Sequence, residues 1–367
     1  MLVYKNTFSY KDPLNIVFLC GNKYAHSDPR EKRKVLKTFL ETNIVNCKVV
    51  ILEENFIFGR TNMQFLAYDD AFLKGLAQVE QLASLYASKI IIIHETISTA
   101  AEIGMFAINP ALAKKICLLT PDDISIEERK ASGFIKLAFM NKNVDDTKIG
   151  THIIYYPDVE VNRSSPEKSD YYTYFHNDKV GKNLGEQIIM FAKQNENKKV
   201  IKFIKSSFGK PSNNVNNVDY FVDDANKEIN IFVHVDTLKI QLLALFFVEK
   251  NRTEFRLIKP IKDHVTFICE QYEELLSNTV AELEGLDIQH YSIKTKLKGT
   301  TICKLRQAVG YYLYMLQAIG LIGLEQNEEL EVSKRKIRIS IELDACKDNL
   351  TGLIYPKGAT QFGRMKT

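Results

Sequence analysis

Short apolar runs alternate with amphipathic stretches along the first part of the chain. The apolar runs predict strands at 15–20 (NIVFLC), 48–52 (KVVIL), 89–94 (KIIIIH) and 115–119 (KICLL). Helices are predicted at 30–42, 68–86 and 99–108, the second of them from apolar positions at three- and four-residue steps. Runs that are apolar at every position are typical of strands covered on both faces. The alternation therefore predicts an α/β fold class with a doubly wound parallel sheet.

Further along, the apolar runs shorten and then stop. Runs at 134–139 and 152–156 predict edge strands, and one helix is predicted at 184–194. The segment 157–182 is rich in charges, and 206–217 (SSFGKPSNNVNN) is rich in turn-forming residues. The chain is therefore expected to contain an α/β domain at 1–156, a connecting region with one helix at 157–217, and a mostly helical domain at 218–367.

The last part of the chain has the outline of a winged helix. A short strand is predicted at 229–235, an apolar segment at 238–248, and helices at 272–286 and 301–318. A glycine turn then leads to the alternating stretch KIRISIEL at 336–343. Helix, turn, helix and a hairpin-like wing is the order of elements in a winged helix.

Length and composition place the chain among ordinary globular proteins. With 367 residues, 45% hydrophobic and 26% charged, two domains are expected. The six cysteines form no CxxC pair, which predicts reduced thiols rather than a disulfide framework or a zinc site. Neither a signal peptide nor an apolar run near the ~20 residues of a bilayer span is recognisable. We therefore expect a cytoplasmic protein with no membrane partner.

The segment 80–107 (EQLASLYASKIIIIHETISTAAEIGMFA) holds the most informative chemistry. A strand ends near residue 93, a short polar loop follows, and Glu102 enters the next helix beside Gly104. In open parallel sheets, ligands bind outside the carboxyl ends of the strands. Cleavage of an N-glycosidic bond develops oxocarbenium-like charge, which a fixed carboxylate stabilises or attacks. The simpler alternative is a first-turn glutamate that is favoured only by the helix dipole.

The loop before Glu102 contributes four further candidates. Ser98 and Thr99 carry hydroxyls suited to ribose or phosphate oxygens. Glu95 would place a second carboxylate near Glu102 and so supply a general acid beside a base. His94 is a candidate for base recognition or proton transfer. For His94, a purely structural role is the alternative.

The remaining candidates precede this loop and are Cys20, Gly21, Asn22, Arg33, Glu53, Glu54 and Glu80. The turn that starts at Cys20 presents backbone N–H groups that suit a phosphate, and Arg33 would add a cation. Glu53 and Glu54 follow the second strand at its carboxyl end, a position suited to holding a ribose. Glu80 would bind ribose hydroxyls or orient Glu102. A surface position on a loop or helix is the alternative for the four charged residues, Arg33, Glu53, Glu54 and Glu80.

Two motifs resemble a known family. STAAEIGMFA (98–107) resembles the "G-T-x-x-E-hydrophobic-G-x-A" signature of nucleoside 2-deoxyribosyltransferase-like proteins, whose glutamate is the nucleophile. FLCG (18–21) resembles the first strand and glycine turn of that family. The chain is more similar still to the N-glycosidase effectors that accompany retron reverse transcriptases in antiphage defence. That likeness includes 18–21, Arg33, 52–54 and Glu80, and covers roughly the first third of the chain.

The resemblance carries expectations about substrate and partners. It implies NAD or a related nucleotide as substrate, with nicotinamide or adenine leaving, and no separate cofactor. The aspartates that transferases carry in this loop are absent and His94-Glu95 stands there instead, so hydrolysis is favoured over transfer. A second subunit completes the pocket in the transferases, which implies a homo-oligomer. In the retron effectors, the reverse transcriptase and its branched RNA–DNA product (msDNA) hold the toxin inactive.

Basic residues collect in the C-terminal part, although the net charge of +4 alone does not indicate a nucleic-acid partner. They are Lys294, Lys296, Lys298, Lys304, Arg306, Lys334, Arg335, Lys336 and Arg338. On a wing, such residues would contact phosphates; the alternative is a solvated basic face.

The sequence leaves three hypotheses for the function. The first is a regulated N-glycosidase toxin, and the second is a nucleotide-sensing module that binds without cleaving and signals to a DNA-binding winged helix. The third is a DNA-binding regulator whose first domain only dimerises.

Overall fold

The chain divides into two compact units that interleave along the sequence. The computed structural model describes residues 1–21, 24–25, 27–28, 31–56, 65–67, 70–94, 99, 102–104, 106, 110–122, 153–157, 175–176, 179–193, 198–258, 261–298, 303–326 and 335–357. The parallel-sheet unit comprises Leu14–Ile57 and Ala87–Glu196, and the mixed-sheet unit comprises Met1–Pro13, Phe58–Tyr86 and Asn197–Thr367. The expected domains were consecutive segments of the chain, whereas each of these units is assembled from segments that are separate in the sequence.

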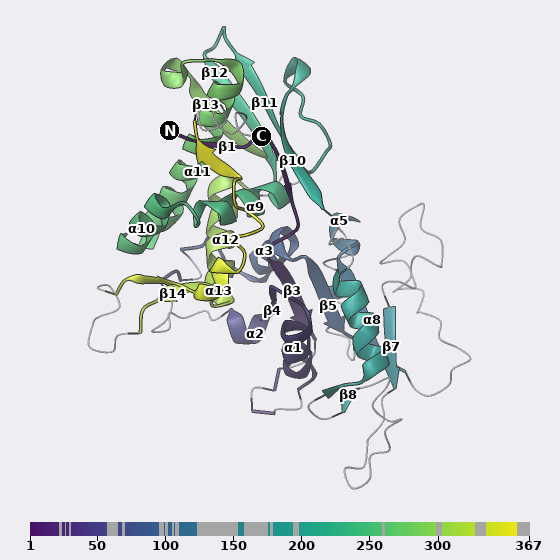
Figure 1. The fold of residues 1–367 in the computed structure, drawn as a ribbon. Coiled ribbons are helices and arrows are strands. Elements are labelled where there is room, and N and C mark those ends of the chain that lie inside the picture. Colours follow the sequence, from purple (N-terminus) through teal and green to yellow (C-terminus); the bar gives the residue numbers. More distant parts are fainter. Residues whose placement is uncertain are drawn as a thin grey trace, which may run out of the picture. The chain divides into compact units, whose positions relative to one another are not determined.

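The parallel-sheet unit contains the α/β sheet that the apolar runs predict. Its strands are β3 (Asn15–Cys20), β4 (Cys47–Ile51), β5 (Lys89–Ile93), β6 (Ile116–Asp122) and β7 (Ile153–Pro157). They pair in the order β4-β3-β5-β6-β7, and every pair is parallel. The central strands β3 and β5 are buried at nearly every position, as expected for strands covered on both faces (Figure 1). The expected strand at 134–139 lies outside the described residues.

Helices α1 (Lys32–Asn43) and α8 (Lys182–Lys193) add apolar side chains to the core of this unit. They contact each other at Gly185, where a Cβ atom would lie 2.5 Å from Cζ of Phe39. Only glycine permits this approach, so residue 185 fixes the spacing of the two helices. The remaining described elements of the unit are α2 (Leu52–Asn55), α5 (Pro110–Ala113), β8 (Phe175–His176) and β9 (Lys179–Val180).

A mixed five-stranded sheet organises the other unit. Its strands are β2 (Thr7–Tyr10), β10 (Lys199–Lys205), β11 (Asn217–Asp223), β12 (Glu228–His234) and β13 (Ser292–Lys298), in the order β13-β12-β11-β10-β2. One face is apolar and buried, with Phe203, Ile231 and Val233 among its residues. Helices α9 (Val235–Leu245) and α11 (Ile261–Glu284) contact the sheet and each other (Figure 1).

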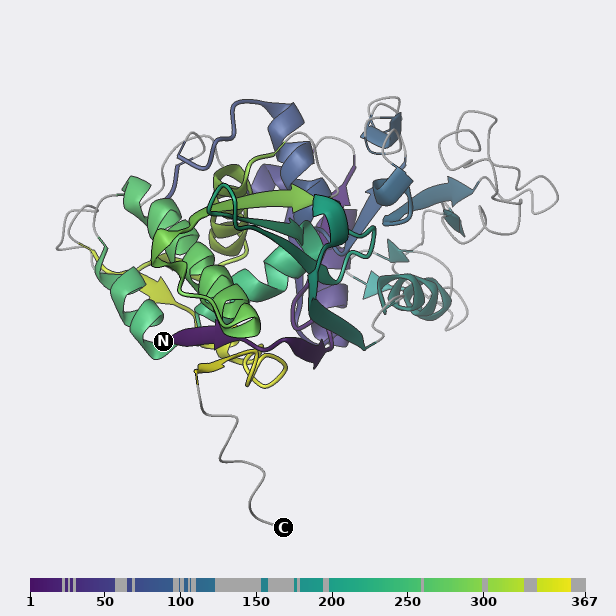
Figure 2. The same ribbon diagram turned by 90° about the horizontal axis from the view of Figure 1, so that it is seen from above.

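Segments far apart in sequence build the helical layer of this unit. Helix α12 (Leu305–Ala318) is buried from Ala308 to Gln317 and contacts α3 (Leu76–Tyr86), α9 and α11. The hydroxyl of Tyr86 donates to the carbonyl oxygen of Ala308 over 2.7 Å. Helix α10 (Glu249–Leu257) lies beside α11 in both views (Figure 2). Strands β1 (Leu2–Tyr4) and β16 (Ile354–Pro356) pair antiparallel.

The expected winged helix is matched only in its parts. Strands β14 (Ile322–Leu324) and β15 (Ile337–Ile339) form an antiparallel pair after α12. Between α11 and α12, however, stands β13, which belongs to the five-stranded sheet. The stretch 336–343 stops being a strand because the side chain of Ser340 caps a new helix, α13 (Ile341–Asp344). A winged helix here stays a prediction.

A search for membrane-spanning segments covered the helices of the described residues. None of these helices combines the length and the apolar character that crossing a bilayer requires.

Candidate active site

The order of the parallel strands reverses between β3 and β5. The chain passes from β3 to β4 on one side, whereas β5, β6 and β7 follow on the other side. In doubly wound sheets, this switch point opens a crevice at the carboxyl ends of the two strands, where ligands bind. Here Gly21 follows the end of β3 and His94 follows the end of β5. The switch point therefore lies where the sequence predicts the site.

His94 and Thr99 are joined by a hydrogen bond at the end of β5. The ring Nδ1 of His94 lies 2.8 Å from Oγ1 of Thr99, and the backbone N–H of His94 donates to the carbonyl oxygen of Leu119 over 2.8 Å. Thr99 is fully buried. Burial lowers the pKa of His94, so its ring is neutral at neutral pH and carries one donor and one acceptor nitrogen. This pair links the end of β5 to Thr99, three residues before Glu102.

Glu102 lies in the segment that the sequence predicts to be helical. Among residues 99–108, the described ones Thr99, Glu102, Ile103, Gly104 and Phe106 all have helical backbone. Ile103 and Phe106 are buried, whereas Glu102 keeps partial contact with solvent. In a helix, a three-residue spacing places Thr99 and Glu102 on one face. Glu102 thus follows the anchored Thr99 by three residues and is partly exposed.

A buried arginine occupies the carboxyl end of β3 and β4. Arg33 is only 1% exposed, and its Nε and NH1 atoms donate to Glu31 over 2.7 Å and to Glu53 over 2.9 Å. The guanidinium carbon lies 4.8 Å from the centre of the Tyr24 ring. A Cβ atom on Gly21 would lie 3.4 Å from Arg33 Cδ, so the absence of a side chain at residue 21 leaves space for the arginine side chain. Arg33 therefore links the first turn to Glu53.

Charges of both signs surround this arginine. Glu31 caps α1 by accepting from the backbone N–H groups of Arg33 and Lys34. On the next turn, Lys37 forms an ion pair with Glu54 over 3.0 Å. Burial raises the pKa of Tyr24 to about 12, with nearby Glu54 and Glu31 adding to the shift. Its phenol is therefore a neutral hydrogen-bonding group beside the ion pairs.

The structure brings most of the predicted site residues to one edge of the parallel sheet. Those described there are Cys20, Gly21, Arg33, Glu53, Glu54, His94, Thr99 and Glu102. Asn22, Glu95 and Ser98 lie outside the described residues, as does the side chain of Glu80, whose helix α3 belongs to the mixed-sheet unit. Sequence reasoning missed Glu31 and Tyr24. An acidic residue directly before a basic helix was the available signal for Glu31, because carboxylates favour helix N-termini.

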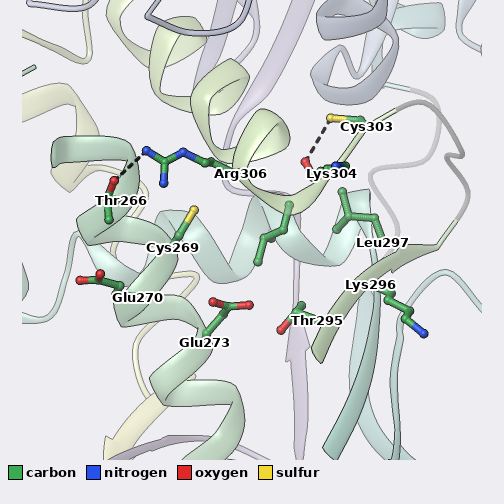
Figure 3. A pocket seen from close by; sticks show the side chains of 11 residues that line it. Thr266, Cys269, Glu270, Glu273, Thr295, Lys296, Leu297, Cys303, Lys304 and Arg306 are labelled. Carbon is green, nitrogen blue, oxygen red and sulfur yellow. Dashed lines mark hydrogen bonds between the residues drawn. The ribbon is translucent and has the colours of Figure 1, made fainter. Parts of the chain in front are cut away.

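The mixed-sheet unit contains a cavity of about 600 Å³ that is lined in part by ionisable side chains. It lies between α11, β13 and α12 (Figure 3). Glu270 and Glu273 face it from one side, and Arg306 donates to Oγ1 of Thr266 over 2.9 Å. Burial raises the pKa of the Cys269 and Cys303 thiols to about 12, which keeps them protonated and poorly nucleophilic. No glycine is among the described residues that line this cavity.

Metal binding has no support in the part of the chain that the structure describes. Within that part, no group of three or more His, Cys, Asp and Glu side chains is arranged to hold a metal ion.

Comparison with known proteins links most of the chain to one family. Residues 29–345 match the family model described as STM3845 retron effector protein. Over 155 residues, 42% of the chain, the sequence is 27% identical to the "Retron Ec73 putative ribosyltransferase/DNA-binding protein" of Escherichia coli. That match spans 45% of the length of the E. coli protein.

Proposed function

Because the chain belongs to the STM3845 family of retron effector proteins, we propose that it is a cytoplasmic N-glycosidase effector with Glu102 as its catalytic carboxylate. Its substrate is NAD or a related nucleotide. The observation that carries the proposal is the place of Glu102. It follows β5 at the switch point of a parallel sheet, beside the bonded pair of His94 and Thr99.

The proposed reaction is hydrolysis at the anomeric carbon of a bound ribosyl group. The C1′–N bond breaks, and its electron pair leaves with the base. The carboxylate of Glu102 stabilises the cationic sugar or bonds to it. Water then supplies the new C1′ oxygen and releases a proton. With NAD the products are ADP-ribose, nicotinamide and a proton.

The neighbouring groups support substrate binding rather than bond cleavage. Gly21 follows β3 at the switch point, where backbone N–H groups are suited to a phosphate, and the Arg33 side chain lies against it. Glu53, which Arg33 holds over 2.9 Å, lies at the end of β4, the position suited to ribose hydroxyls. The neutral imidazole of His94 is suited to hydrogen bonding with an uncharged leaving base.

Regulation by the retron complex completes the proposal. The name of the E. coli relative joins a putative ribosyltransferase to DNA binding. For this chain we propose that the reverse transcriptase and its msDNA hold the effector inactive, and that a homo-oligomer completes the pocket. These partners are consistent with membership of a retron effector family.

The test compares Glu102→Gln with Glu186→Gln, an exposed glutamate on α8 of the same unit. Purified full-length protein is incubated with NAD, and the free base is measured by chromatography. We expect Glu102→Gln to lower release by at least about 10³-fold, as expected when the group that stabilises transition-state charge is lost, and Glu186→Gln to retain wild-type release. Full turnover by Glu102→Gln refutes the assignment. Calorimetric binding of NAD without any product favours the nucleotide-sensing alternative.

A further inference from the structure

Among the described residues, one face of the mixed five-stranded sheet is covered only in part, by the 3-10 helix η4 (Ser207–Gly209) and the loop after it, which contact β11. Register places Phe232 of β12 opposite Asp219 of β11 and Lys296 of β13, while Phe221 of β11 stands opposite Asn230 of β12. Paired residues share a face of a sheet. Phe221 and Phe232 are partly exposed here, whereas their strand neighbours Tyr220 and Val233 belong to the buried face. We call the exposed side, which carries Phe221, Phe232, Lys202, Ile204 and Lys296, the open face.

Two aromatic rings form the centre of the open face. Phe221 and Phe232 are diagonal neighbours on antiparallel strands, where residues lie roughly 7–8 Å apart. Gly209, with φ at +67°, lies beside Phe221 and covers part of one edge of the ring, which stays partly exposed. Ile204, on β10, is 38% exposed and extends this apolar strip. Flat rings at adjacent positions are suited to stacking planar groups.

The charges on the open face leave a positive balance beside these rings. The buried Asp219 is paired with the partly buried Lys298, and Glu228 is paired with Lys294. Lys202 and Lys296 are exposed, and among the described residues neither has an ion-pair partner. The ammonium of Lys296 lies 5.7 Å from the centre of the Phe232 ring. Figure 3 shows Lys296 pointing away from the carboxylates of Glu270 and Glu273.

A pocket of about 470 Å³ adjoins Phe232 at one end of the open face. Its walls are the loop 211–215 and the ends of β12 and β13. Asn213 and Asn214 bring amide groups, and His234 brings a second ring. Small-molecule pockets have about this size, so one nucleotide unit fits it. Lys298 holds the wall in place by donating to the carbonyl oxygens of Asn214 and Asn217 over 3.1 and 2.8 Å.

We propose that the open face binds a single-stranded nucleic acid by stacking its bases on Phe221 and Phe232 and contacting its phosphates through Lys202 and Lys296. Sheet-borne aromatic side chains beside basic ones are a general way to hold unpaired bases, because every base has a π-face. Duplex bases are stacked on each other and cannot reach the rings. This surface is separate from the glycosidase site, and it is not the wing on which the sequence placed nucleic-acid contacts.

The experiment measures fluorescence anisotropy of a labelled dT homopolymer of about 12 nucleotides with full-length protein. Unlabelled RNA of the same length and a blunt duplex serve as competitors. Phe232→Leu keeps the apolar bulk but removes the flat ring, and we expect it to raise Kd by about five- to 150-fold, equivalent to about 1–3 kcal/mol per stacked base. Lys296→Gln should reduce the slope of log Kd against log salt by about 0.7.

The matched control is Lys250→Gln, on α10, where the lysine side chain is 77% exposed. It should leave both Kd and the salt slope unchanged. Thermal unfolding checks that each variant is folded. Three outcomes overturn the proposal: no binding at about 100 µM protein in low salt, duplex binding as tight as single-strand binding, or full affinity in Phe232→Leu. The first of these would assign the open face to a protein partner. Because no cleavage is measured, failure here and failure of the glycosidase assay are independent.

Discussion

Replacement of Arg33 by methionine tests whether the buried ion pairs of this arginine contribute more to the free energy of unfolding than exposed ion pairs do. The variant keeps an unbranched stem but removes the hydrogen bonds to Glu31 and Glu53 and the contact with the Tyr24 ring. A hydrogen bond to a charged group contributes about 1.5–3 kcal/mol, and that estimate applies to Glu31, which is 11% exposed. Glu53 is 41% exposed, so solvent screening reduces its share to at most about 1 kcal/mol. A desolvated cation–π contact adds about 0.5–2 kcal/mol.

These contributions are not additive, and we expect Arg33→Met to lower the free energy of unfolding by about 3 kcal/mol. The control is Lys37→Met, one turn later on α1. Its ion pair with Glu54 has side chains 25% and 40% exposed, so a loss of about 0–1 kcal/mol is expected. Urea unfolding followed by circular dichroism gives both values. Equal losses in the two variants would show that burial does not distinguish the pairs, and the reasoning would be wrong.

Two further predictions concern the same unit. Gly185→Ala should cost about 1–3 kcal/mol because the new methyl group would meet Phe39 at 2.5 Å, and Phe39→Leu in the same chain should recover part of that loss in urea unfolding. Lys89, 3% exposed with its ammonium 4.2 Å from the centre of the Phe191 ring, has its pKa lowered to about 8 by burial. Between pH 8 and the ordinary lysine value the unfolded chain binds a proton that the folded protein has released, so stability should rise with pH there. Urea midpoints of Lys89→Met should lack this rise, and an identical rise in the variant would contradict the assignment.

The strands of the parallel sheet were predictable because a strand that is buried on both faces carries apolar residues at nearly every position. The run 15–20 matches β3 at both ends, and 48–52 and 89–94 match β4 and β5 to within one residue. The location of Glu102 followed from the same logic, since a strand end and a helix start bracket it. Periodicity specifies which face is buried but never what covers it.

That limit explains where the sequence reasoning fell short. The apolar stripe at 68–86 indicates a helix correctly only from Leu76, because residues 70–75 are not helical and Phe72 has a positive φ. The hydroxyl of Tyr86 bonds to Ala308, more than 200 residues later. The lysines of SIKTKLK suggested a basic surface, so the edge strand β13 was not predicted. In the structure, exposed and half-buried positions alternate along this strand. Arg33 was expected to hold a phosphate. Its side chain bonds to Glu31 and Glu53, the first of which was not considered.

The interleaved chain has a practical consequence for work on fragments. The backbone passes between the two units at 13/14, 57/58, 86/87 and 196/197, so one proteolytic cut at any of these crossings leaves three covalent tethers. A fragment ending near residue 156 would carry β2 without its partner β10 and α3 without α12. Such a piece would expose unpaired backbone and apolar surface, both of which promote aggregation. Gene truncation is therefore a poor way to separate the candidate active site from the open face, and point substitutions are the appropriate tool.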